Sequence, residues 1–284
     1  MSERQRLTIP DLRKKKRAGE RVVMASITDY IMAQWAERGG VDIVAIGDSL
    51  AMITYGHPNT LAMTIDQMIE HTKAVIRGAP HTMSLVAMPY GSYATPELAV
   101  TNALRLMKES GVDAVKMQGG REKFAIIKAV ADAGVPVMSH VGMCPHFVHS
   151  YGGFKLQGRT AEEAMRIVDD ARAIQEAGAI GLEIEAVPPE VGAAVDAAVD
   201  IFTFSIGAGG AGCGQLLLGA DLLGAFDNFK PKFAKRYGNI AEVATRAFAA
   251  YAEDVRTHRF PAEEHCYRMK PEEAERFREM LGRQ

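Results

Sequence analysis

The sequence has 284 residues, of which 48% are hydrophobic and 24% charged, and its formal net charge is -2. This near-neutral balance argues against nucleic acid or an anionic membrane as the main partner. No apolar stretch reaches the roughly 18 residues that a transmembrane helix needs, and no apolar signal core follows the basic N-terminal segment. The cysteines, Cys144, Cys213 and Cys266, are odd in number and widely spaced, which favours a reducing compartment. We therefore expect a cytoplasmic protein that binds neither nucleic acid nor membrane.

Segments typical of strands and of helices alternate along the chain. The basic run at residues 13–17 is expected to be the solvated face of a first helix. The predicted strands are Arg21–Ser26, Ile43–Ile46, Met83–Ala87, Ala114–Met117, Val135–His140, Gly181–Glu185, Ile201–Ser205 and a short eighth around Leu216–Gly219. The predicted helices are Tyr30–Arg38, one from Thr64 to about Gly78, one from Thr95, Arg121–Ala133, Thr160–Ala177 and Pro189–Val199.

Repeated strand–helix units predict a parallel sheet, and seven or eight of them favour closure into a (β/α)8 TIM barrel. An open doubly wound sheet is the alternative, but its nucleotide loop would follow the first strand, whereas the glycine run 207–212 follows the seventh. We predict a single barrel domain over residues 1–284, in which residues 239–284 form a C-terminal helical extension. This extension contains one helix to Thr257 and another at Pro271–Leu281, both expected to serve packing or oligomer contacts.

Polar and charged residues follow several of the predicted strands, where barrels place their active sites. Lys116 lies one residue before the end of the predicted fourth strand, and a buried ammonium there is costly without an anionic partner. Together with the carboxylates and the imidazole at the other strand ends, it predicts an anionic, carbonyl-bearing substrate, on which Glu185 would move a proton. A lone histidine is more often a satisfied core residue. The residues expected at this mouth are Asp48, Ser49, Ala87, Lys116, Gln118, His140, Glu185 and Ser205.

Three motifs carry a resemblance to a known family: Gly47-Asp48-Ser49-Leu50, His140-Val141-Gly142 and Gly152-Gly153-Phe154-Lys155-Leu156-Gln157-Gly158-Arg159. In them the chain resembles ketopantoate hydroxymethyltransferase (3-methyl-2-oxobutanoate hydroxymethyltransferase), in unbroken order over roughly residues 10–265. The resemblance implies a barrel of the phosphoenolpyruvate/pyruvate-binding type. It also implies one-carbon transfer from 5,10-methylenetetrahydrofolate to a branched 2-oxo acid, through a magnesium-stabilised enolate, in pantothenate biosynthesis. The family's assembly implies a homodecamer or another homo-oligomer.

The resemblance also implies roles for single residues. Asp48 would be a metal ligand, and Asp48, Ser49 and Lys116 would hold the substrate. Glu185 would be the general acid/base, with Lys116 and His140 as further catalytic residues. Two acids of the family's metal site are absent, because Ala87 and Gln118 stand in their places. Since magnesium is usually held through carboxylates, we expect a weakened Mg2+ site in which Gln118 offers only a neutral oxygen.

Three functions stay open on the sequence alone. The chain could be a hydroxymethyltransferase whose weak metal site is completed by substrate and water. It could be a divergent relative with weak or no magnesium dependence that performs aldol, retro-aldol or decarboxylation chemistry on another 2-oxo acid. It could also be a non-catalytic binding protein, although the presence of Lys116, His140 and Glu185 together disfavours that.

Two loops carry weaker signals. The spacing Cys144-x-His146-x-x-His149 does not match a standard zinc pattern, and nothing in it predicts an activated cysteine nucleophile. The glycine run Gly207–Gly214 could serve a phosphate or folate tail, or could be flexible packing.

Overall fold

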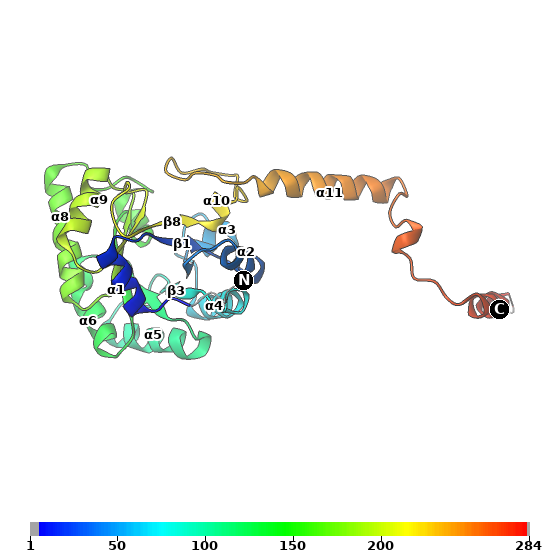
Figure 1. The fold of residues 1–284 in the computed structure, drawn as a ribbon, viewed down its shortest axis with the longest axis horizontal. Coiled ribbons are helices and arrows are strands. Elements are labelled where there is room, and N and C mark those ends of the chain that lie inside the picture. The colour runs from blue at the N-terminus through cyan, green and yellow to red at the C-terminus, as the bar shows by residue number, and fades with distance from the viewer. Residues whose placement is uncertain (1–5, 283–284) are drawn as a thin grey trace. The chain divides into compact units, whose positions relative to one another are not determined.

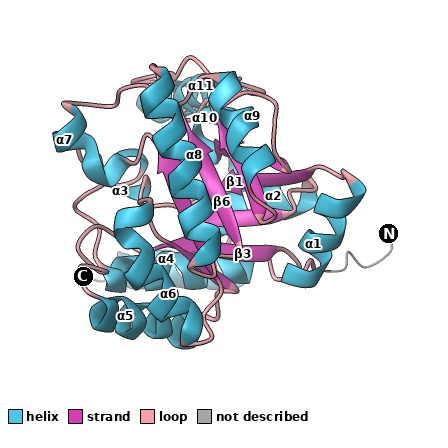
Figure 2. Ribbon diagram, turned by 90° about the vertical axis from the view of Figure 1, so that its left-hand side faces the viewer, coloured by secondary structure: helices cyan, strands magenta, loops and turns pink. Residues whose placement is uncertain are grey.

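Eight parallel strands form a closed barrel in the computed structural model, which describes residues 6–282 (Figures 1 and 2). They pair in chain order, and β8 closes the barrel on β1. The predicted TIM barrel is therefore confirmed, and the eighth strand begins two residues before its predicted start. The strands are β1 (Val22–Ser26), β2 (Ile43–Ile46), β3 (Met83–Ala87), β4 (Ala114–Lys116), β5 (Val137–Gly142), β6 (Gly181–Glu185), β7 (Phe202–Ile206) and β8 (Gly214–Leu218).

Helices surround the strands, as Figure 2 shows. Those between consecutive strands are α2 (Tyr30–Arg38), α4 (Ile65–Gly78), α5 (Pro96–Ser110), α6 (Phe124–Asp132), α8 (Ala161–Glu176) and α9 (Pro189–Ala198). Thr64 and Thr160 begin α4 and α8 with reciprocal capping boxes, so these starts follow from the sequence. Three four-residue helices were not predicted, because they are too short for a periodic pattern. They are α3 (Leu50–Ile53), α7 (Val148–Tyr151) and α10 (Gly219–Leu222).

The basic run lies on α1 (Ile9–Ala18), the predicted first helix. Arg13, Lys14 and Arg17 are exposed, as expected of a solvated face. Lys16 differs, because its Nζ donates to the carbonyl oxygens of Val199 and Ile201 at 3.0 and 2.6 Å. The run therefore also ties the helix to the segment that enters β7.

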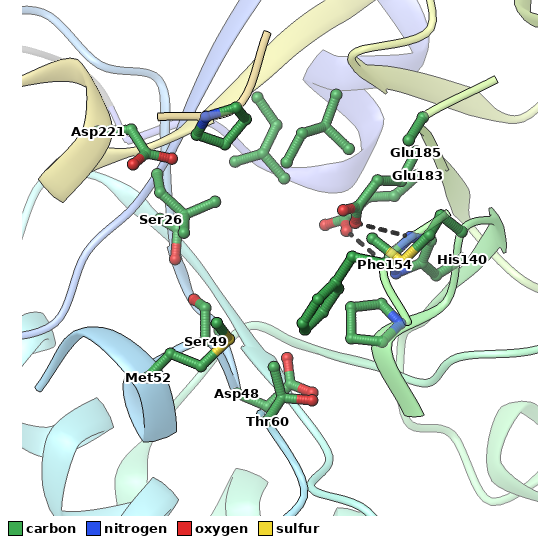
Figure 3. Close-up of a pocket in the computed structure, with 18 of the residues that line it drawn as sticks. Ser26, Asp48, Ser49, Met52, Thr60, His140, Phe154, Glu183, Glu185 and Asp221 are labelled. Atoms are coloured by element: carbon green, nitrogen blue, oxygen red, sulfur yellow. Dashed lines mark ion pairs between the residues drawn. The ribbon is translucent and has the colours of Figure 1, made fainter. Parts of the chain in front are cut away.

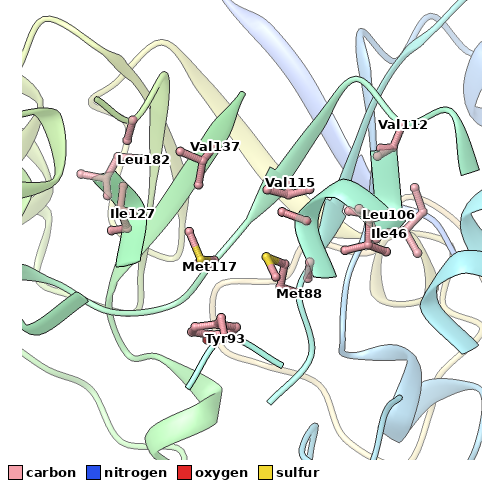
Figure 4. Packing of buried hydrophobic residues seen from close by; sticks show 14 of the residues in the cluster. Ile46, Met88, Tyr93, Leu106, Val112, Val115, Met117, Ile127, Val137 and Leu182 are labelled. Carbon is pink, nitrogen blue, oxygen red and sulfur yellow. The ribbon is translucent and has the colours of Figure 1, made fainter. Parts of the chain in front are cut away.

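The strands are mostly apolar because most of their residues are buried on both faces of the sheet. In β2, Ile43 and Ala45 belong to the cluster inside the barrel, whereas Val44 and Ile46 belong to the layer between strands and helices. Figure 4 shows part of that layer, in which Ile46 and Val115 lie near Leu106 of α5. Burying one such side chain fully contributes about 1.5–3 kcal/mol. The barrel mouth is thus held on a densely packed frame.

The chain divides into two compact units. The first ends at Gly238 and contains the barrel. The second begins at Asn239 and contains α11 (Ile240–Arg256) and α12 (Pro271–Leu281), near the helix bounds expected for the extension. In the described part of the chain, no residue of these two helices is buried, and no helix is long and apolar enough to cross a membrane.

Candidate active site

A cavity of about 300 Å3 lies at the mouth formed by the C-terminal ends of the strands (Figure 3). In Figure 3, His140, Glu183 and Glu185 lie on one side of it, and Asp48 and Ser49 on the other. Ala87 and Ser205 are buried and lie outside the described lining. The structure thus brings the other predicted site residues together, and all of them line the cavity: Asp48, Ser49, Lys116, Gln118, His140 and Glu185.

Lys116 has a close anionic partner that the sequence reasoning missed. Its Nζ donates to Oε2 of Glu183 at 2.6 Å, and both side chains are buried. Burial alone would lower the pKa of Lys116, but the charges of Glu183 and Asp48 outweigh burial and raise it. Lys116 is therefore a charged ammonium. Glu183 could have been found from the sequence, because it lies two residues before Glu185 on a buried strand and so shares its face.

Glu185 and His140 are both uncharged near neutral pH. Burial raises the pKa of Glu185 to about 8, against the opposing effect of Lys116. Burial, helped by the charge of Lys116, lowers the pKa of His140 to about 3. His140 Nε2 lies 3.2 Å from Glu185 Oε2 without the alignment of a hydrogen bond, and neither ring nitrogen has an aligned partner among residues 6–282. A carboxyl whose pKa lies near the working pH is suited to general acid–base chemistry.

Asp48 is ionised and faces nitrogen atoms. Its Oδ2 lies 2.7 Å from Nε2 of His146 and accepts a hydrogen bond from Nε2 of Gln118 at 3.0 Å. Burial would raise the pKa of Asp48, but the contact with His146 and the charge of Lys116 lower it to about 2. From the sequence, His146 was considered only as a zinc ligand. In the structure it contacts Asp48.

The amide of Gln118 has a fixed orientation. Its Oε1 accepts a hydrogen bond from the backbone N–H of His146 at 2.9 Å, and a backbone N–H can only donate. The amide nitrogen, not the oxygen, therefore faces Asp48. Within residues 6–282 no group of three or more His, Cys, Asp or Glu side chains is placed to hold a metal. The residues around Asp48 do not fit magnesium as arranged, and the assignment of Asp48 and Gln118 as its ligands stays a prediction.

Several buried polar atoms on the cavity wall lack a partner within the described residues: Oγ of Ser26, Oγ1 of Thr60 and Oε1 of Glu183. Buried polar groups are normally hydrogen-bonded, so atoms left unpaired around a cavity indicate a polar ligand. The outer wall is apolar and includes Phe154 and Phe233. The arrangement suits a small acid with a hydrocarbon part.

The ends of β5 and β6 approach each other closely, and this places His140 beside Glu185. A Cβ on Gly142 would lie 2.3 Å from the carbonyl oxygen of Glu185, and φ is +88° at Gly142. Ala186, directly after Glu185, has φ +44°, a left-handed conformation that is uncommon for alanine. Strained backbone at the end of a strand is frequent at functional sites.

The two weaker loop signals have packing contacts. Ser205 Oγ accepts a hydrogen bond from the N–H of Ala208 at 3.0 Å and donates one to the carbonyl of Gly209 at 2.8 Å. The start of the glycine run is therefore hydrogen-bonded to the strand that precedes it. These contacts favour packing for that loop. The thiol of Cys144 donates to the carbonyl of His140, and burial raises its pKa well above the ordinary value. His149 is exposed.

The chain is similar to known proteins over nearly its whole length. The family model of ketopantoate hydroxymethyltransferase matches residues 6–263. A protein of Methylibium petroleiphilum named 3-methyl-2-oxobutanoate hydroxymethyltransferase 1 is 50% identical over 280 residues, covering 98% of this chain and 95% of that protein. The 3-methyl-2-oxobutanoate hydroxymethyltransferase of Moorella thermoacetica is 43% identical, covering 94% of this chain and 100% of that protein.

Solved structures resemble the chain in fold alone, at low sequence identity. A phosphonopyruvate hydrolase in complex with oxalate and Mg2+ has a TM-score of 0.61 and 14% identity, covering 98% of this chain and 99% of that one. A 2,3-dimethylmalate lyase, described as a member of the PEP mutase/isocitrate lyase superfamily, has a TM-score of 0.57 and 16% identity, covering 94% and 93%. These likenesses support the barrel fold alone.

Proposed function

Because the chain belongs to the ketopantoate hydroxymethyltransferase family, we propose that it transfers a one-carbon unit to a branched 2-oxo acid, 3-methyl-2-oxobutanoate. The donor is 5,10-methylenetetrahydrofolate, and the reaction belongs to pantothenate biosynthesis. The observation that carries this proposal is the pairing, in one cavity, of a charged Lys116 with a Glu185 whose pKa lies near 8.

The chemistry requires a proton to leave C3 of the 2-oxo acid. Glu185, in its carboxylate form, takes this proton, and the electron pair of the C–H bond moves into the enolate. The enolate oxygen acquires negative charge, which the buried Lys116 ammonium stabilises. C3 of the enolate then forms the new carbon–carbon bond to the methylene carbon, whose two bonds to folate nitrogens break. Water supplies the hydroxyl oxygen of the product and gives its protons to the two nitrogens, so that tetrahydrofolate leaves, and the hydroxyl group takes the proton that left C3. Neutral His140 lies beside Glu185, with Nε2 3.2 Å from its Oε2.

The cavity matches such a substrate in size and lining. Its volume of about 300 Å3 is at the small end of ligand sites. The unpaired hydroxyls of Ser26 and Thr60, with Ser49 beside them, can donate to the carboxylate of the acid. Met52 and Phe154 can contact its branched hydrocarbon part.

A second function is favoured by the nitrogen-rich surroundings of Asp48, which do not fit magnesium. Here the same Lys116 and Glu185 act on another 2-oxo acid in an aldol, retro-aldol or decarboxylation reaction. Product analysis separates the two, because only the first forms a hydroxymethylated acid that depends on added 5,10-methylenetetrahydrofolate.

Exchange of the C3 proton tests the proposed chemistry. Wild type should exchange the C3 hydrogen of 3-methyl-2-oxobutanoate with D2O, followed by proton NMR. Glu185→Gln should slow this exchange by about 100-fold or more, since a positioned base contributes that much. Glu190→Gln, an exposed position on α9, is the matched control and should behave as wild type. Failure of wild type to exchange any 2-oxo acid offered would reject a catalytic function of this kind.

A further inference from the structure

We propose that this chain binds its 2-oxo acid without a divalent cation, and that His146 holds Asp48 in place of a metal. The inference rests on the proposed function, since it concerns the same cavity and the same class of substrate. The inference follows from three features. The ring proton of His146 lies on the nitrogen that faces Asp48, N–H groups already contact Oδ2 of Asp48, and the cavity offers other hydrogen-bond donors to the substrate.

The hydrogen bonds of Tyr93 assign the proton on His146. A tyrosine hydroxyl carries a proton that it can donate. The hydroxyl lies 2.6 Å from His146 Nδ1, which is closer than its other acceptor, the carbonyl of Gln118 at 3.4 Å. Nδ1 is therefore the acceptor nitrogen, and the ring proton lies on Nε2. Nε2 is the atom that faces Asp48.

Oδ2 of Asp48 is consequently occupied by N–H groups. The Nε2–H of His146 lies against it at 2.7 Å in a bent contact, and the Gln118 amide donates to it at 3.0 Å. A cation bound at Oδ2 would be repelled by the His146 Nε2–H and by the amide hydrogens of Gln118. The side chain of His146 is only 3% exposed and lies outside the described lining of the cavity. His146 is thus a positioning residue and does not contact the substrate.

The other carboxylates of the cavity do not offer a replacement site. Oε2 of Glu183 is held by Lys116, which leaves only Oε1 free, and Glu185 is protonated near neutral pH. Burial raises the pKa of Asp221, and in Figure 3 it lies apart from Asp48 and Glu183. Magnesium needs several hard oxygen ligands, usually including one or two carboxylates, and Asp48 has one free oxygen left. The cavity instead offers donors: the Lys116 ammonium and the hydroxyls of Ser26 and Thr60. Such donors bind a carboxylate and a carbonyl oxygen directly.

Calorimetry on the full-length protein tests the first part of the inference. The probe is 3-methyl-2-oxobutanoate, titrated once in EDTA and once in MgCl2. We expect the same Kd in both. Binding in MgCl2 alone would overturn this inference and leave the proposed function standing. Absence of binding in both conditions would overturn the inference together with the proposed substrate.

The role of His146 is tested with Mn2+, whose free-ion EPR signal disappears on binding. Wild type should leave that signal unchanged. The double variant Ala87→Asp/Gln118→Glu introduces the two acids that the family's metal site carries. Adding His146→Gln to this double variant should tighten Mn2+ binding at least about tenfold further. An effect of this size is expected for a group next to a metal ligand. His149→Gln, on an exposed histidine of the same loop, is the matched control and should add nothing. Equal Mn2+ affinity with and without His146→Gln would overturn the assignment.

Discussion

Lys116 and Glu185 lie in the same cavity, yet they respond to burial in opposite ways. Glu183 is 2.6 Å from the Lys116 ammonium and keeps it charged. Glu185 lacks a comparable cation contact, since His140 is neutral, and burial keeps its carboxyl protonated near neutral pH. Environments that separate the charge states of neighbouring groups are how enzymes assign acid and base roles.

The pKa of Glu185 predicts a pH dependence. A base acts in its deprotonated form, so with a pKa of about 8 the activity is lost as pH falls below 8 and present above it. At pH 7 about one molecule in ten carries the carboxylate. We expect kcat/KM for C3 proton exchange to rise roughly tenfold per pH unit below about 8 and then to level off. The measurement is exchange by NMR across buffers. A rate independent of pH between about 6 and 9 would contradict Glu185 as the base.

His146 marks the limit of what the sequence could tell about single residues. Its loop position was visible, but its contact with Asp48 depends on how the loop after β5 folds back over β2 and β4. Glu183 was predictable in principle from strand alternation. The mouth residues Asp48, Lys116, His140 and Glu185 were found because strand ends are visible as abrupt changes from apolar to polar sequence.

At the scale of elements, the strands could be predicted because most of their residues are apolar. The residues at which the strands begin and end were harder to predict. Strand β5 was expected from Val135 and begins at Val137, since Pro136 has no N–H to give to the ladder. Gly142 is the one feature of the sequence that indicates the close approach of β5 to β6. A glycine alone does not reveal which backbone lies against it.

This approach gives a prediction with a built-in control. Gly142→Ala would place a Cβ 2.3 Å from the Glu185 carbonyl, at a φ of +88°. Gly134 has a similar φ of +82° but no atom within 4 Å of a Cβ. Gly134→Ala should therefore cost about 1–2 kcal/mol, the left-handed penalty alone.

Gly142→Ala should cost more than Gly134→Ala in urea unfolding, because a backbone clash adds to the same conformational penalty. It should also slow C3 exchange, since relief of the clash moves Glu185 away from His140. Equal losses of stability in the two variants, with exchange unaffected in both, would show that the strand approach does not matter for the site.

At the scale of the whole molecule, the chemistry belongs to one of the two units. All described residues that line the cavity precede Gly238. The barrel itself was predictable, because repeated strand–helix units in a chain of this length have few other solutions. The purpose of the second unit was not, since charged amphipathic helices look alike whether they pack within a chain or between chains.

Helix α11 carries an apolar stripe that bears on the expected homo-oligomer. Phe248, Tyr251 and Val255 follow a helical spacing and are 74%, 57% and 43% exposed. Exposed apolar patches of this kind mark protein–protein contacts, and a second copy of the chain is the partner that the expected homo-oligomer supplies. Sedimentation should therefore give a multiple of the 30.8 kDa chain mass.

Charge placed on that stripe should break the assembly. Phe248→Glu with Tyr251→Glu buries two carboxylates in any contact that uses the stripe, and each costs several kcal/mol to desolvate, so the sedimenting mass should fall. Ala250→Glu adds a carboxylate to an exposed position away from the stripe and should leave the mass unchanged. A wild type that sediments as a single chain, or a double variant of unchanged mass, would contradict this role for α11. Because the cavity is lined by the barrel unit, the double variant should still exchange the C3 proton, which separates assembly from chemistry.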